Sequence, residues 1–276
     1  MIQSEPLETV RLAHIRIFPI KSLPAVSLDE TALCPNGALR NDRRWALIDG
    51  EGKFVNAKRT AQIHLLEAAF SPDLDAVTLS VSGRPHETYS LHGDRSGLAG
   101  YLSAFFGFAV RVIEQPAGGF PDDTEAPGPT LISTATLETV ARWFPGLSLE
   151  NVRQRFRTNL EFTTSAPFWE DRLYGRAGSA VEFRVGEVLL SGTNPCQRCV
   201  VPTRDPATGE IFPRFTPEFL RQRESSLPAW AELSRFNHFY RLAVNTRGVD
   251  CPTSARIRLA DELVVSESRI VRKIGH

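Results

Sequence analysis

Two cysteines separated by two residues are the sharpest chemical signal in the chain. They lie in the hexapeptide Asn194-Pro195-Cys196-Gln197-Arg198-Cys199. A cysteine thiolate is a soft metal ligand, and a cation such as Arg198 beside it favours the charged form that metals bind. The hexapeptide therefore predicts a metal or redox site, with two buried and inert thiols as the plain structural alternative.

Three kinds of site are compatible with this spacing. A zinc site needs two more ligands, and the candidates Cys251 and His238 do not have a recognised zinc spacing. A thioredoxin-like dithiol usually begins a helix, whereas Val200-Val201-Pro202 makes a poor first turn. A single metal thiolate, with the other cysteine structural, is favoured by the turn-forming Asp-Pro and Thr-Gly pairs of residues 204–209.

Three other segments place cations and hydrogen-bonding side chains next to expected strands. They are Phe18-Pro19-Ile20-Lys21-Ser22, Arg40-Asn41-Asp42-Arg43-Arg44-Trp45 and Arg155-Phe156-Arg157-Thr158-Asn159-Leu160. Lysine and arginine can bind a phosphate or another anion, and arginine does so with two parallel hydrogen bonds. We interpret residues 155–160 as a strand, on which alternate side chains such as Arg157 and Asn159 share a face. Each segment alone is more typical of a solvated surface.

Composition restricts the class of protein. The chain has 276 residues, 42% of them hydrophobic, which is typical of a globular protein. It carries 32 Lys and Arg against 32 Asp and Glu, and this balance argues against a nucleic-acid binder. The longest uncharged run, Ser96 to Val110, is too short for a membrane span. The first residues do not resemble a signal peptide, and four cysteines are too few for a disulfide framework, so we expect a cytoplasmic protein.

The elements that must position these residues are mostly strands. Gln115 to Pro129 contains four prolines and three glycines and is expected to be a linker between domains at residues 1–114 and 130–276. Strands are predicted at residues 10–20, 45–48, 53–55, 76–81, 159–163, 180–185, 188–190, 255–259 and 263–265, and helices at 97–106, at 136–144 and from Thr216. The expected fold class is mainly β (α+β), with two β-barrel-like domains and a few peripheral helices.

The order of the four segments resembles the MOSC proteins, which carry a domain shared with the C-terminal part of molybdenum cofactor sulfurases. The N-terminal part is similar to the β-barrel domain that precedes MOSC in the amidoxime-reducing components. The resemblance extends from about Val10 to Val265. Its most specific element is CQRC followed by DPATG.

The resemblance implies a molybdenum cofactor (Mo-molybdopterin), a pterin dithiolene that carries molybdenum and a phosphate. It implies that Cys199 is the catalytic thiolate ligand of the metal and that Cys196 is not. The cofactor-binding residues that it implies are Lys21, Ser22, Arg43, Arg157, Asn159 and Arg198. Arg44 stands where the family often has an apolar or aromatic residue, so either Arg43 or Arg44 could bind the cofactor.

The function that we expect is an oxidoreductase that reduces a small-molecule substrate, N-hydroxylated (amidoxime-type) or otherwise oxygenated, by two-electron oxygen transfer. The alternative is a cofactor carrier or sulfur-handling protein without turnover. Neither a second cysteine cluster for an iron–sulfur centre nor a G-x-G-x-x-G dinucleotide motif is found. We therefore expect a separate electron-transfer protein and reductase as partners, and neither nucleic acid nor membrane.

Overall fold

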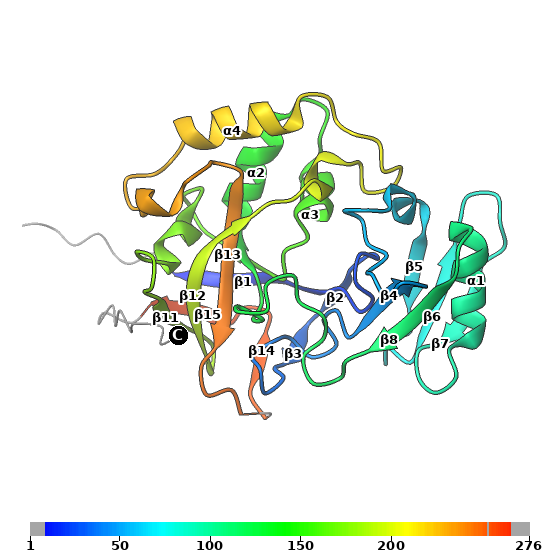
Figure 1. Ribbon diagram of the computed structural model, residues 1–276. Helices are drawn as coiled ribbons and strands as arrows, with labels where there is room; N and C mark the ends of the chain where they lie inside the picture. The colour runs from blue at the N-terminus through cyan, green and yellow to red at the C-terminus, as the bar shows by residue number, and fades with distance from the viewer. Residues whose placement is uncertain (1–8, 253, 266–276) are drawn as a thin grey trace, which may run out of the picture.

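A closed barrel of seven strands forms the larger part of the protein (Figure 1). The structure is a computed structural model, and it describes residues 9–252 and 254–265. The strands follow the order β10-β9-β13-β12-β11-β15-β1, and pairing of β1 with β10 closes the circle. Their bounds are β1 Val10–Ile17, β9 Leu131–Ser133, β10 Leu160–Thr163, β11 Val181–Val185, β12 Val188–Gln197, β13 Arg241–Gly248 and β15 Glu262–Val265. A short strand, β2 (Val26–Leu28), extends the sheet from β1.

Strand β1 joins the start of the chain to a barrel built otherwise from residues after 130. It pairs antiparallel with β10, Ile15 lying opposite Leu160, and with β15, Arg11 lying opposite Glu262. Apolar side chains of β1 fill the barrel core because alternate residues of a strand face one side. The limits at residues 114 and 130 stay a prediction, and the outer limits, 1 and 276, lie outside the described residues.

Three helices lie together on one side of the barrel and surround a second, aromatic core (Figure 1). They are α2 (Thr134–Trp143), α3 (Leu149–Phe156) and α4 (Phe215–Ser225). The hydroxyls of Ser133 and Ser148 cap the first two by accepting backbone N–H bonds. Phe144 and Phe215 stack with their ring centroids 4.3 Å apart. This packing fixes the end of α3, which borders the site described below.

The N-terminal part consists of small sheets around its own core (Figure 1). Strand β4 (Trp45–Asp49) pairs with β8 (Val110–Glu114), and β5 (Glu67–Phe70), β6 (Ala76–Ser80) and β7 (Glu87–Ser90) form a meander beside α1 (Ser96–Phe106). Strand β3 (Glu30–Ala32) pairs with β14 (Arg256–Arg258). Short 3-10 helices occur at η1 (Ala61–Leu65), η2 (Trp169–Leu173), η3 (Val201–Thr203) and η4 (Leu233–Arg235). The predicted class, mainly β with a few helices, is confirmed.

Two local predictions are wrong. Residues 155–160 are not one strand: helix α3 continues to Phe156, Arg157 is left-handed (φ 51°), and β10 begins at Leu160. The Ser148 cap and the buried apolar face of Val152 and Phe156 favour the helix over the short alternation that we interpreted as a strand. The strand expected at residues 53–55 is reduced to one bridge between Ile48 and Phe54.

Candidate active site

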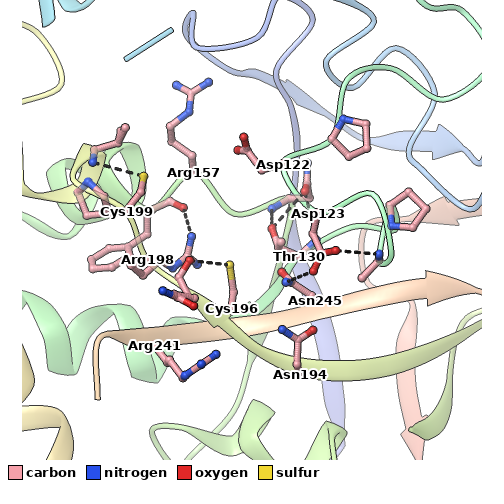
Figure 2. Close-up of a pocket in the computed structure, with 18 of the residues that line it drawn as sticks. Asp122, Asp123, Thr130, Arg157, Asn194, Cys196, Arg198, Cys199, Arg241 and Asn245 are labelled. Carbon is pink, nitrogen blue, oxygen red and sulfur yellow. Dashed lines mark hydrogen bonds between the residues drawn. The ribbon is translucent and has the colours of Figure 1, made fainter. Parts of the chain in front are cut away.

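All seven residues predicted to form the site border one cavity of about 730 Å³. They come from four separate parts of the chain and meet where β12, the end of α3 and the loop after β1 approach one another (Figure 2). The residues are Lys21, Ser22, Arg43, Arg157, Asn159, Arg198 and Cys199. The geometry therefore brings together groups that are far apart in the sequence.

The two cysteines occupy different positions at the end of β12. Cys196 belongs to the strand, whereas Cys199 follows it, and its sulfur accepts a hydrogen bond of 3.5 Å from the amide of Val201 (Figure 2). Burial raises the pKa of the Cys196 thiol, which keeps it protonated. In residues 9–252 and 254–265, no group of three or more His, Cys, Asp or Glu side chains could hold a metal. The zinc alternative with Cys251 and His238 therefore receives no support.

Three cations gather at one end of the cavity. Lys21 Nζ donates to the carbonyl of Phe120 at 2.8 Å and to Asp122 Oδ1 at 2.9 Å. The Arg157 guanidinium lies 4.1 Å, and that of Arg43 5.0 Å, from the centroid of the Phe18 ring. Both arginines thus contact one aromatic ring, an arrangement that holds their positive charges close together.

The electrostatics of this end favour an anion. Burial and the neighbouring Arg43 lower the pKa of Arg157 to about 9, because desolvation and a like charge both disfavour the cation. Burial also lowers the pKa of Lys21. Burial alone would raise the pKa of Asp122, but Lys21 and Arg43 hold it well below its usual range. An added anion would relieve the repulsion between these cations.

Three of the predicted residues have left-handed backbone conformations. The φ angles are 75° at Ser22, 50° at Arg43 and 51° at Arg157. Residues other than glycine adopt this region at a cost of about 1–3 kcal/mol, and such residues are concentrated at functional sites. The backbone strain at these three positions is a separate observation from the side-chain chemistry. Both observations indicate that the cavity is a functional site.

Asn159 and Arg198 border the cavity, but their polar atoms are bonded to other protein groups, mostly of the backbone. Asn159 Nδ2 donates to the carbonyl of Arg16 at 3.0 Å, and its Oδ1 accepts from the amide and the hydroxyl of Thr130. Arg198 donates twice to the carbonyl of Leu242 and once to that of Phe156. These two side chains join separate segments and hold the cavity wall in place.

Arg43 and Arg44 have different environments. Arg44 pairs with Glu114 at 2.6 Å and donates to Asn41 Oδ1 at 3.0 Å, away from the cavity. Arg43 forms an ion pair with Asp42 and borders the cavity. Arg43 is therefore the arginine of this element that can meet a ligand there.

Two protein-family models match this chain. A model of the MOSC N-terminal beta barrel domain matches residues 9–102, and a model of the MOSC domain matches residues 130–248. The chain belongs to the MOSC family. The resemblance to MOSC proteins that the sequence analysis identified is thereby confirmed.

The similar curated proteins are molybdenum cofactor sulfurases. The protein of Drosophila mojavensis is 26% identical over 255 residues, which cover 82% of this MOSC chain and 32% of the relative. That of Danio rerio is 25% identical and aligns with 68% of this chain and 27% of the relative. The chain thus spans about a third of the length of these relatives. The crystal structure of the YuaD protein from Bacillus subtilis aligns with 93% of this chain and 94% of its own, with 12% identity and a TM-score of 0.39.

Several residues around the cavity of this MOSC chain were not singled out from the sequence. They are Lys58, Asp122, Asp123, Asn194, Arg235, Arg241 and Asn245. Asn245 Nδ2 donates to Asp123 Oδ2 at 3.0 Å, so β13 holds the segment 115–129 over the cavity (Figure 2). Asp122 and Asp123 lie next to each other between two prolines of that segment, but no sequence pattern places them near Lys21.

No described helix is long and apolar enough to cross a membrane.

Proposed function

We propose that this cavity binds the molybdenum cofactor and that the protein reduces N-hydroxylated or related oxygenated substrates by two-electron oxygen transfer at molybdenum. The observation that supports this most is that one cavity joins an accessible thiol, Cys199, to a cluster of three cations, Lys21, Arg43 and Arg157. A cofactor with a soft metal at one end and a phosphate at the other needs such a combination. The MOSC domain and the sulfurase relatives indicate a function related to this cofactor.

The residues present fit such a group. The cavity volume of about 730 Å³ lies within the range of roughly 300–1,000 Å³ of small-molecule sites. Arg157 uses one of its N–H groups on the carbonyl of Leu23, at 2.8 Å, and directs the rest of a charged fork at the cavity. Lys21, Arg43 and Arg157 would hold the phosphate, and Cys199 would hold the metal.

The protein's own residues supply position and electrostatics. When bound, the cofactor supplies a metal centre that exchanges two electrons and an oxygen atom with a substrate. The Val201 amide donates a hydrogen bond to the Cys199 sulfur and thereby fixes its position. Arg198 fixes the turn between the two cysteines through its carbonyl bonds, and Asn159 fixes the loop that carries Arg157.

Electrons would come from a separate protein. Cys34 and Cys251, the cysteines outside the CQRC element, are free thiols in different surroundings. An iron–sulfur centre generally needs four thiolates close together, and no three His, Cys, Asp or Glu side chains of the described residues are grouped so that they could hold a metal. We propose a separate electron carrier and reductase that make a small and transient contact.

A cofactor carrier or sulfur-handling protein without turnover is the second candidate. Two facts favour it. The relatives are named molybdenum cofactor sulfurases, and this chain spans only about a third of their length. A carrier needs the same phosphate site and the same thiol but no access for a substrate.

The test uses protein purified from a host that makes molybdenum cofactor. Metal and pterin contents are measured, followed by reduction of benzamidoxime with reduced methyl viologen. The proposal expects about one molybdenum and one pterin per chain, and turnover. Stoichiometric cofactor without turnover of amidoximes, N-oxides or hydroxylamines would favour the carrier. Protein with bound zinc and without pterin would overturn both proposals.

A further inference from the structure

A pair of arginines borders the cavity at a place remote from the three cations described above. Arg235 ends η4 (Leu233–Arg235), and Arg241 begins β13, opposite Gln197 of β12. Both border the cavity, together with Ser234, Asn237 and Ala177. We call this part of the cavity, defined by Ala177, Ser234, Arg235, Asn237 and Arg241, the arginine arm.

The charges of the arginine arm are not balanced by carboxylates. Neither arginine forms an ion pair within 4.0 Å with any described residue. The carboxylate that acts on Arg235 is that of Glu232, which also pairs with Arg176 at 3.7 Å and accepts from the amide and the hydroxyl of Ser234. Burial and the neighbouring Arg241 lower the pKa of Arg235, and burial lowers that of Arg241. Two cations left together without a counter-ion are stabilised by a bound anion.

The two arginines of the arginine arm also have N–H groups without a hydrogen-bond partner among the described residues. Arg241 donates to the carbonyl of Pro195 at 3.0 Å and to Asn237 Oδ1 at 2.8 Å, while its buried Nε has no partner among the described residues. Arg235 donates once, to the carbonyl of Gly175 at 3.3 Å. A guanidinium carries five N–H donors, so both side chains retain donors for a ligand. Native structures leave few buried donors without a partner, so the free Nε of Arg241 needs an explanation, which a bound ligand beside this side chain would supply.

The arm is separate from the end proposed for the phosphate. Charges that act on Arg157 come from Arg43, Asp122, Asp42 and Cys199, whereas those that act on Arg241 come from Cys196 and Tyr174. Figure 2 shows Arg157 and Arg241 well apart, with Cys196 between them. One phosphate cannot serve both groups of cations, so the arginine arm needs an anion of its own.

We propose that the arginine arm binds a carboxylate of the substrate, and that the preferred substrates are N-hydroxylated or N-oxygenated compounds that carry a carboxylate. This rests on the proposed function. The planar fork of an arginine matches a carboxylate with two parallel bonds. A molecule held there by its carboxylate can reach Cys199 within the same cavity, because Cys196, Gln197 and Cys199 all border it. Asn237 is a positioning residue, since its Oδ1 accepts from Arg241 and sets the orientation of that fork.

The experiment compares benzamidoxime with 4-carboxybenzamidoxime, using holoenzyme and reduced viologen. We expect the carboxylated compound to have the higher kcat/KM. The ratio of the two kcat/KM values should fall about 10- to 100-fold in Arg235→Gln and in Arg241→Gln, since a charge-assisted hydrogen bond contributes about 1.5–3 kcal/mol. Arg184→Gln, which removes an exposed arginine whose NH1 donates to the carbonyl of Glu187, is the matched control and should keep the ratio.

Direct binding separates this inference from the proposed function. Calorimetric titration of 4-carboxybenzamidoxime into each variant measures the carboxylate contact whether or not turnover occurs. Binding that is weakened in both arm variants and kept in Arg184→Gln supports the arm even if neither compound is reduced, which would count against the proposed function alone. Equal ratios and equal affinities in the wild type and both arm variants would overturn the arm while leaving benzamidoxime reduction intact.

Discussion

Lys21 Nζ lies 2.9 Å from Asp122 Oδ1, although the two residues are 101 positions apart in the chain. Lys58 approaches the same oxygen at 3.4 Å. A carboxylate from the segment 115–129 therefore neutralises the cation cluster that we propose for the phosphate of the cofactor. The same ion pair that holds the segment over the cavity competes with an anionic ligand.

Replacement of Asp122 by Asn should strengthen anion binding at this end of the cavity. The substitution removes the competing charge and keeps a side chain of the same size. We expect about tenfold tighter binding of inorganic pyrophosphate to cofactor-free protein, measured by isothermal titration calorimetry. Glu125→Gln removes an exposed carboxylate from the same segment and is the control. Unchanged or weaker binding to Asp122→Asn would show that the carboxylate does not compete.

Replacement of the two cysteines by serine should have different effects. Cys199→Ser exchanges a soft sulfur for a hard oxygen at the proposed metal position and should abolish turnover. Cys196→Ser should leave substantial activity. Molybdenum content and benzamidoxime reduction are measured for both. Equal loss in the two variants would point to a dithiol instead.

Loss of a single cation should weaken cofactor binding without unfolding the protein. Alanine at Lys21, Arg43 or Arg157 removes a charge-assisted contact of about 1.5–3 kcal/mol, so the cofactor affinity should fall about 10- to 100-fold. Retained pterin and the thermal unfolding curve are measured together. Because Arg43 and Arg157 are left-handed, asparagine, which tolerates that conformation, provides a second variant at each position. Full pterin retention in all of them would contradict a shared phosphate site.

Glu170 should make the stability depend on pH. Its side chain is 3% exposed, and burial together with Asp171 raises its pKa to about 7. The unfolded chain releases this proton near its ordinary pKa of about 4.3, so the free energy of unfolding should decrease as the pH rises from about 4.3 to 7. Glu170→Gln cannot ionise and keeps a group that can bond to the Thr136 hydroxyl.

Urea unfolding at pH 5 and pH 7.5 measures this effect. The wild-type protein should lose up to about 3 kcal/mol between the two values, and Glu170→Gln clearly less. Parallel pH profiles of the two proteins would show that Glu170 is ionised throughout.

Purified protein should not reduce benzamidoxime with NADH or NADPH alone. The sequence contains neither a second cysteine cluster for an iron–sulfur centre nor a G-x-G-x-x-G dinucleotide motif. Reduced viologen, or a separate reductase with an electron carrier, should restore turnover. Sustained reduction by NADH in protein free of other chains would reveal an unrecognised redox centre.

Much of the candidate site could be predicted because its elements are local motifs. The CQRC and Lys-Ser elements are each contiguous in the sequence. Their thiols and cations indicate metal and anion binding from residue type alone. Their convergence is a property of the barrel: β1 pairs antiparallel with β10, so Lys21, which follows β1, lies at the same end as Arg157, which precedes β10. The order of the four segments predicted that they form one site. It did not predict which strands pair to bring them together.

The rest depends on packing that a linear pattern does not express. Residues 155–160 alternate like a strand, yet the Ser148 cap and the contacts of Phe156 with Phe215 and Phe219 extend α3 as far as Phe156, and β10 begins only at Leu160. Asn159 and Arg198 look like ligand-binding residues, but backbone carbonyls accept from the Nδ2 of Asn159 and from the guanidinium of Arg198. The arginine arm was missed because Arg235 and Arg241 are isolated cations in the sequence, and only η4 and β13 bring them to the cavity.

Strand β1 has a consequence for any attempt to divide the protein. Since it lies between β15 and β10, the chain leaves the barrel at residue 17 and returns to it at β9, and the smaller sheets form an insertion within the larger domain. A fragment that starts at residue 130 would lack strand β1 of the barrel. It would expose two unpaired strand edges, which are templates for aggregation. A circular permutant that places residues 9–18 after β15 would keep the barrel closed.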